Sequence, residues 1–316
     1  MKPAAVVLLC LLLFSLSMNS QELRLYELDL IEAKNSESFA FVSLSDSYQL
    51  SDSKDSLAIP DLSNKKAEDV QCFKLDSKYR KRFFERAKIS ENDILFAYDY
   101  AKNVLVSMPV KNLDAVACLS PYIGTNDSFP YTQYDYMIGF RVKLSALKGF
   151  TDYLVTNLVY VGKASPFIEG ELKPVIWKKI APKEYPSKSI DAEDAAILGS
   201  YVLGNCYKFE TAGLLYYIQD FLRNDNEVFA RRLLVLDSKT KKNQCEKIYM
   251  TSEGCSLAPL AFDAKADEMP EQWTGRLLKN KPGVIFGFTY MSFGCEGINF
   301  LNQDVPDLYI SCDNRH

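Results

Sequence analysis

Apolar and polar residues alternate along several short stretches, with the period of two that is typical of half-buried β-strands. Two short apolar runs at 94–98 and 104–108, on either side of a polar turn at 99–103, predict a hairpin. Further strands are expected at 22–32, 39–44, 71–75, 136–144, 153–162, 205–209, 233–236, 247–250, 283–291 and 307–311. Within 22–32 the apolar positions change phase, which predicts a bulge near Glu27.

Apolar residues three or four positions apart predict helices at three other places. A helix is expected after Asp76, which can cap it, because Tyr79 and Phe83 would share one face. Helical spacing also occurs at 191–203 and 212–222. The chain should therefore contain both sheets and packed helices.

The order of elements in the first half recurs in the second half. In each half, a predicted strand that contains a cysteine is followed by a predicted helix, a predicted hairpin and a second cysteine. The first unit runs from Cys72 to Cys118, and the second runs from Cys206 to Cys255. An internal duplication and two unrelated units of a common type both explain this order. The predicted fold is α+β, with two possibly duplicated lobes, each a small antiparallel sheet with packed helices and disulfide ties.

Composition divides the chain into lobes and connecting segments. The predicted lobes span 21–165 and 189–316, and a Pro- and Lys-rich segment at 166–188 is the predicted linker. A stretch rich in Ser, Asp and Lys at 43–69 is predicted to be a solvated loop.

The first twenty residues have the pattern of a signal peptide. Lys2 precedes an uncharged apolar run at 4–14, and a short segment of mainly small and polar residues ends at Ser20. We expect removal of 1–20 and export to a periplasmic or extracellular space. No later stretch is apolar for long enough to predict a transmembrane segment in the mature chain.

Charge and histidine content exclude several classes of function. The chain has 41 acidic and 37 basic side chains and an isoelectric point near 5.3, which argues against nucleic acid as a partner. The single histidine is the terminal residue His316, so His-based triads and zinc sites are not expected. No cofactor motif occurs: glycine-rich phosphate loops and the Gly-x-Ser-x-Gly elbow are absent from the sequence.

The cysteines predict disulfides, because an exported chain meets an oxidising environment. Of the 8 cysteines, Cys10 lies in the predicted signal peptide, which leaves 8 − 1 = 7. The expected pairs are Cys72 with Cys118, Cys206 with Cys255, and Cys295 with Cys312. Cys245 would remain unpaired, although a pairing of Cys245 with Cys255 stays open.

Two readings of function follow from these features. The first is an exported, non-catalytic protein that recognises a protein or surface polymer through Tyr- and Phe-rich faces. The second is a hydrolase that uses only Asp and Glu carboxylates, acting on glycans. Its candidate residues are Glu169 and Glu171, close in sequence to Trp177, although a solvated turn before the linker is the preferred explanation of this pair. The non-catalytic reading is preferred.

Overall fold

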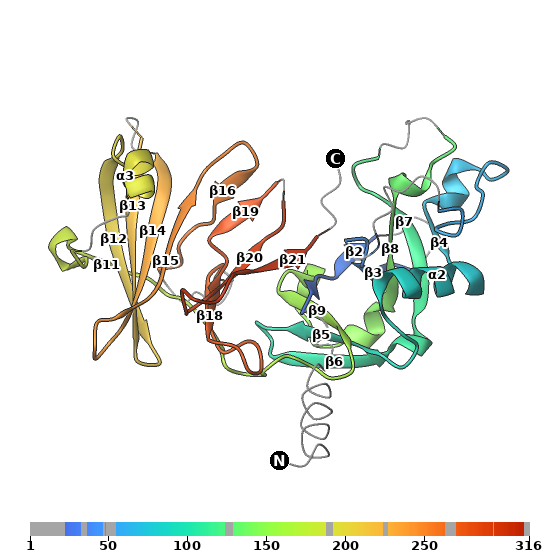
Figure 1. Ribbon diagram of the computed structural model, residues 1–316, viewed down its shortest axis with the longest axis horizontal. Coiled ribbons are helices and arrows are strands. Elements are labelled where there is room, and N and C mark those ends of the chain that lie inside the picture. Colours follow the sequence, from blue (N-terminus) through green and yellow to red (C-terminus); the bar gives the residue numbers. More distant parts are fainter. Residues whose placement is uncertain are drawn as a thin grey trace, which may run out of the picture.

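The chain forms an assembly of β-sheets with few helices, as the computed structural model in Figure 1 shows. The structure describes residues 23–32, 37–46, 48, 55–123, 129–187, 192–223, 227–262, 270–292 and 294–312. In these ranges 21 strands are accompanied by two α-helices, α2 (Ser77–Ala87) and α3 (Ala192–Leu198). The protein is therefore mostly β, and the predicted α+β fold with helices packed on each sheet is wrong.

The largest sheet takes strands from both ends of the chain. Its nine strands run in the order β10 (Leu172–Pro174), β17 (Trp273–Gly275), β18 (Val284–Phe286), β20 (Gly297–Phe300), β21 (Leu308–Ser311), β1 (Leu25–Tyr26), β9 (Asn157–Gly162), β5 (Ile94–Asp99) and β6 (Val104–Pro109). The pairing of β1 with β21 is parallel, and the other neighbours are antiparallel. The first and last strands thus join the two halves of the chain.

A smaller sheet and helix α2 complete the N-terminal half. Its five strands run in the order β2 (Asp29–Ile31), β3 (Phe39–Ser43), β8 (Tyr136–Lys143), β7 (Asp114–Leu119) and β4 (Cys72–Lys74). Helix α2 buries Phe83 against Phe140 of β8, with ring centroids 5.5 Å apart. This helix lies where the sequence predicted one, because its apolar residues face a single core.

The C-terminal half is built on a second five-stranded sheet. Its strands run in chain order: β11 (Lys178–Ile180), β12 (Val202–Thr211), β13 (Leu214–Leu222), β14 (Val228–Asp237) and β15 (Asn243–Met250). A two-stranded sheet pairs β16 (Cys255–Leu257) with β19 (Thr289–Met291). The 3-10 helices of the described chain are η1 (Ala67–Val70), η2 (Val110–Asn112), η3 (Gln133–Asp135), η4 (Leu144–Leu147), η5 (Asp152–Leu154) and η6 (Pro182–Glu184).

Both faces of the nine-stranded sheet are buried. On β5, Leu95 faces the core of the N-terminal half, whereas Phe96 faces a central core that it shares with Phe286 of β18. On β18, Ile285 faces the opposite way, into the core of the C-terminal sheet. Side chains alternate across a strand, so the sheet curls around the central core and carries one further core on its outer face at each end.

The predicted helix at 212–222 is instead strand β13, which pairs with β12 on one side and β14 on the other. Tyr216 and Ile218 face the C-terminal core, and Leu215 and Tyr217 face a separate cluster. A strand buried on both faces has a continuous apolar run, which fits helical spacing equally well. Because helix α2 has no counterpart here, the two halves do not repeat the same order of elements.

The predicted linker and the predicted solvated loop both contain buried residues. Within 166–187, β10 and β11 belong to two different sheets, and both Val175 and Trp177 are fully buried in the C-terminal core. Within the predicted loop at 43–69, Tyr48 and Leu62 pack into the N-terminal core. The amino-acid composition of the two segments indicated a polar surface. It did not show which apolar residues of each segment pack into a core.

The predicted signal peptide at 1–20 lies outside the described residues. Within the described ranges, no helix combines the length and apolar character needed to cross a membrane.

Candidate functional site

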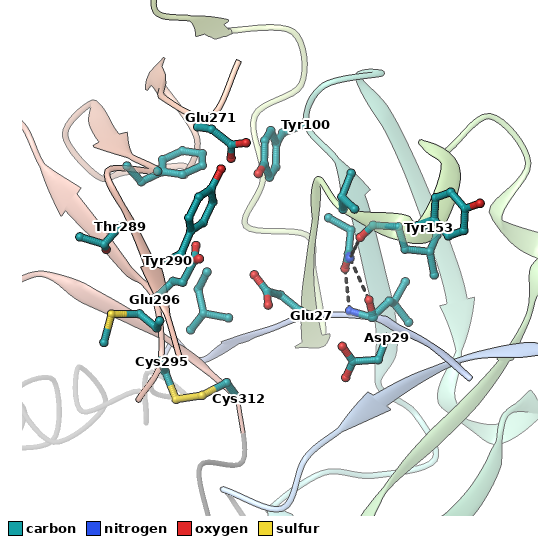
Figure 2. Close-up of a pocket in the computed structure, with 18 of the residues that line it drawn as sticks. Glu27, Asp29, Tyr100, Tyr153, Glu271, Thr289, Tyr290, Cys295, Glu296 and Cys312 are labelled. Carbon is teal, nitrogen blue, oxygen red and sulfur yellow. Dashed lines mark hydrogen bonds between the residues drawn. A yellow bond between two sulfur atoms is a disulfide. The ribbon is translucent and has the colours of Figure 1, made fainter. Parts of the chain in front are cut away.

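A cavity of about 550 Å³ opens where the two halves of the chain meet (Figure 2). One wall is formed by 27–30 and the turn at 153–155, and the other by 289–291 and 294–296. We call it the acidic pocket, because four carboxylates line it: Glu27, Asp29, Glu271 and Glu296.

Glu27 reaches the pocket because the chain changes sheets there. Strand β1 ends at Tyr26 in the nine-stranded sheet, and β2 begins at Asp29 in the smaller sheet. Between them, the Asn157 side chain accepts a hydrogen bond from the Leu28 N–H at 2.7 Å and donates one to the Leu28 carbonyl at 3.0 Å (Figure 2). The phase change predicted as a bulge near Glu27 is therefore a change of sheet.

Burial shifts the acidity of these carboxyl groups in one direction. It raises the pKa of Glu27 from 4.5 to about 8, and repulsion from Glu296 and Asp29 adds to the shift. Burial also raises the pKa of Asp29, and burial with repulsion from Glu271 raises the pKa of Glu296. A carboxyl group in a poorly solvated site with like charges nearby retains its proton, so Glu27 is mainly protonated at neutral pH.

Among the described residues that line it, the acidic pocket has no basic side chain to balance its carboxylates. No lysine, arginine or histidine is among its lining residues, and the carboxyl groups of Glu27, Asp29 and Glu296 form no hydrogen bond or ion pair with any residue in the described ranges. Buried acids elsewhere are paired: Asp220 accepts a hydrogen bond from Arg231 at 3.2 Å. Unpaired carboxylates in a cavity leave favourable interactions available to a ligand.

Two tyrosines stand beside the carboxylates. The ring of Tyr100 packs edge-on against Trp273 and Phe286, with centroids 5.4 and 5.3 Å away. Tyr290 donates a hydrogen bond to Glu271. Burial raises the pKa of both hydroxyl groups, with nearby carboxylates contributing, so both hydroxyls remain protonated near neutral pH.

Gly287 allows Glu271 to approach the opposite strand. Its φ angle is +85°, and a Cβ atom there would lie only 2.0 Å from the Glu271 carbonyl oxygen. This combination of left-handed backbone and close contact requires glycine.

The mouth of the acidic pocket carries exposed apolar and aromatic side chains. Tyr153 and Val155 lie on one wall, and Tyr290 and Met291 lie on the other. Tyr153 is 74% exposed and, like Leu154 next to it, has a left-handed backbone with φ near +60°. Strained residues of this kind often occur at functional sites. Because the Tyr153 side chain is exposed, packing within the protein does not compensate for its backbone strain. We call these four exposed residues the rim.

A buried aspartate holds the turn that carries Tyr153. Asp99 is fully buried and accepts hydrogen bonds from the Thr151 N–H at 2.6 Å, the Thr151 hydroxyl at 2.9 Å and the Thr156 hydroxyl at 2.9 Å. It also accepts one from the Lys102 N–H at 2.9 Å. These contacts satisfy the carboxylate and fix both ends of the turn.

The described chain contains two disulfides, Cys72 with Cys118 and Cys295 with Cys312, which are two of the three pairs expected. The second lines the acidic pocket directly beside Glu296 (Figure 2). It ties the end of β21 to the segment before β20.

The expected pair of Cys206 with Cys255 does not form, since both residues are free thiols. The Cys206 thiol is buried and donates a hydrogen bond to Gln219 at 2.9 Å. The pairing was inferred from a duplication that the element order does not support. Cys245 is also free, and burial in the C-terminal core raises its pKa to about 11.

A second cavity, of about 480 Å³, lies between 55–62 and 131–134. Its acid Asp55 is already engaged, since it accepts hydrogen bonds from Arg82 at 2.8 Å and from Tyr48 at 3.0 Å. Because this acid is paired within the protein, the acidic pocket is the stronger candidate site.

The residues singled out from the sequence lie away from the acidic pocket. Glu169 and Glu171 are exposed near the start of β10, and Glu171 lies 3.4 Å from Arg276. Trp177 is buried in the C-terminal core and donates a hydrogen bond to Gln272. The structure does not gather these three residues into a cleft. The phase change near Glu27 was the sequence signal for the pocket, but it did not identify the acids on the opposite wall.

No protein-family model, no curated protein and no solved structure matches this chain.

Proposed function

We propose that the protein is an exported, non-catalytic binding protein, and that it recognises a protein or surface polymer through the acidic pocket and its rim. The observation that carries this proposal is the strained, 74% exposed Tyr153 at the mouth of a cavity in which Glu27, Asp29 and Glu296 have no partner among the described residues. Tyrosine is a favourable contact residue, because it offers a large rigid surface and a polar end. Export is supported by the signal-like N-terminus and by the two disulfides.

A second candidate is glycan hydrolysis by carboxylates. Its support is Glu27, since a carboxyl group that retains its proton at neutral pH can act as a general acid. Such enzymes also need an ionised carboxylate nearby, with the two pKa values separated by their environments. Here the pKa values of Asp29 and Glu296 are raised as well, and no lysine, arginine or histidine among the described lining residues holds either group ionised. Binding is therefore the better supported function.

Retention of surface material by the immobilised chain tests the proposal. Polymers and exported proteins from the source organism would be applied to the wild-type chain and to the rim variant Tyr153→Ala/Tyr290→Ala. The matched control is Tyr122→Ala/Tyr134→Ala, two exposed tyrosines outside the acidic pocket. We expect the wild type and the control to retain the same component, and the rim variant to lose about tenfold or more of that affinity.

The retained material also distinguishes the two candidates. Binding predicts recovery of an intact component. New reducing ends that the wild type releases and Glu27→Gln does not would favour the hydrolase and contradict the proposed function. Equal retention by the rim variant and the wild type would show that recognition occurs elsewhere.

A further inference from the structure

We propose that the group entering the acidic pocket is an organic cation with at least two ammonium or guanidinium groups. This inference rests on the proposed binding role and specifies the chemistry of the ligand. Three sources of such a cation are a free polyamine, a polymer of amino sugars and a basic peptide. Probes of each kind distinguish these sources by their affinity.

The placement of charge supports more than one cationic group. Glu27 and Asp29 come from the junction of β1 and β2, whereas Glu271 and Glu296 come from segments that precede β17 and β20. Figure 2 shows the two pairs on opposite walls. A ligand with separated positive charges can pair with both walls at once, and charge-assisted hydrogen bonds of this kind are stronger than neutral ones.

Two polar groups inside the pocket point independently to a ligand. Glu27 and Tyr100 are partly buried and line the cavity (Figure 2), and burial raises the pKa of the Glu27 carboxyl and of the Tyr100 hydroxyl. Neither forms a hydrogen bond with another residue in the part of the chain that is described. Buried polar groups normally have partners, so these two are ready to contact a bound donor.

The size and walls of the acidic pocket suit an organic cation. A cavity of about 550 Å³ lies in the range that small organic ligands occupy. The rings of Tyr100, Tyr153 and Tyr290 line it, and aromatic faces attract ammonium and guanidinium groups. Leu28, Leu154 and Ile310 supply apolar surface for the carbon chain between the charges.

Binding should release a proton. The titratable groups that line the pocket with Glu27 are Asp29, Glu271, Glu296, Tyr100, Tyr153 and Tyr290, and they supply no positive charge. The empty pocket therefore holds the Glu27 proton, whereas a bound cation favours the ionised carboxylate. Affinity should rise with pH up to about 8, because the ligand no longer has to displace that proton.

Isothermal titration calorimetry on the full chain tests the inference with three cationic probes: spermidine, a trimer of glucosamine and trilysine. The matched neutral probes are hexane-1,6-diol and the N-acetylated trimer, and CaCl₂ serves as an inorganic cation. The variants are Glu27→Gln and Glu296→Gln, with Glu169→Gln as an exposed control outside the pocket. Thermal unfolding of each variant confirms that it is folded.

We expect at least one cationic probe to bind and to release a proton, so that the measured binding enthalpy changes with the ionisation enthalpy of the buffer. Each pocket variant should lose about tenfold in affinity, and the control should bind like the wild type. The cationic probe that binds most tightly identifies the source of the cation. The inference would be overturned if no cationic probe bound to the wild-type chain, if the neutral probes bound as tightly as the cationic ones, or if Ca²⁺ alone bound. Binding of the N-acetylated trimer through the rim would do so while leaving the proposed binding function in place.

Discussion

Glu27 acquires its properties from residues far away in the sequence. Its own neighbours signal a break in strand phase, and that break was predictable. The carboxylates Glu271 and Glu296, which share its pocket, lie in the opposite half of the chain, and the pairing of β1 with β21 together with the central core brings the two halves together. Sequence patterns describe local periodicity, so they could not predict this cluster. The exposed pair Glu169 and Glu171 was a candidate site only because the two acids lie two positions apart and close to Trp177 in the sequence.

The Glu27→Gln substitution should remove a pH-dependent loss of stability. The folded-state pKa of Glu27 lies above its ordinary value, so the folded chain binds more protons than the unfolded chain between pH 4.5 and about 8. This contribution to the free energy of unfolding is fully present below pH 4.5, falls by about 1.4 kcal/mol per pH unit, and is lost near pH 8. Urea unfolding across this range should show the full slope in the wild type and in Glu171→Gln, and a slope smaller by the Glu27 contribution in Glu27→Gln, where Asp29 and Glu296 still titrate with raised pKa values. The same slope in all three proteins would contradict the assignment.

The free thiols should differ in reactivity according to their burial. Cys206 and Cys245 are buried, whereas Cys255 is partly exposed. Burial raises the pKa of all three thiols, so each reacts slowly, but only Cys255 is accessible to reagent without unfolding. Alkylation of the native chain followed by mass spectrometry should label Cys255 first among them. A native peptide that links Cys206 to Cys255 would restore the pairing first expected from the sequence.

Individual elements were predictable where the local pattern was distinctive. Helix α2 lies at its predicted position, because its apolar residues recur at helical spacing on one buried face. The β5–β6 hairpin also lies where it was predicted, because two short apolar runs flank a polar turn, although β5 is buried on both faces. Strand β13 was predicted as a helix, because Leu214 to Ile218 are all apolar or aromatic and both faces are covered. The turn at η5 illustrates a different limit. Its left-handed Tyr153 depends on hydrogen bonds to Asp99, which is on another strand.

The Asp99→Asn substitution should loosen this turn. An amide at this position can accept fewer of the four hydrogen bonds and places an unpaired N–H group in a buried site. We expect a loss of about 1 to 3 kcal/mol in the free energy of unfolding, with faster hydrogen exchange at Thr151 and weaker ligand retention at the rim. The neighbouring exposed Asp152→Asn provides the control and should behave like the wild type. Matching behaviour of the two variants would mean that Asp99 does not hold the turn.

The whole molecule is organised around a sheet that unites its first and last strands. The sequence pattern predicted two lobes joined by a linker. In the structure, the predicted linker contributes β10 and β11 to two sheets, and the strands near the two ends, β1 and β21, pair in the nine-stranded sheet. Long-range pairing between β1 and β21 leaves no local signal, so this architecture could not be read from periodicity. The acidic pocket exists because of it, since one wall comes from each half (Figure 2).

Removal of the Cys295–Cys312 disulfide should release the pocket wall at 294–296 from the segment that follows β21. Cys295 and Cys312 close a loop with a sequence separation of 17 residues, and such a link stabilises by about 3 kcal/mol in the chain-entropy picture. Cys295→Ser/Cys312→Ser should lower the free energy of unfolding by roughly that amount and speed hydrogen exchange at Glu296. Cys255→Ser, which removes a free thiol, is the control. If exchange at Glu296 stayed unchanged, the disulfide would not position this wall.

The measurement that tests the account most directly is the ionisation of Glu27 with and without a bound cation. The carboxyl carbon of labelled glutamate can be followed by NMR as pH is varied, and Glu27→Gln identifies the signal. In the empty chain Glu27 should titrate near pH 8, and saturating spermidine should lower its pKa by one unit or more, about 1.4 kcal/mol. A Glu27 that titrates near 4.5 in the empty chain, or a raised pKa that spermidine leaves unchanged, would contradict an acidic pocket built to receive an organic cation.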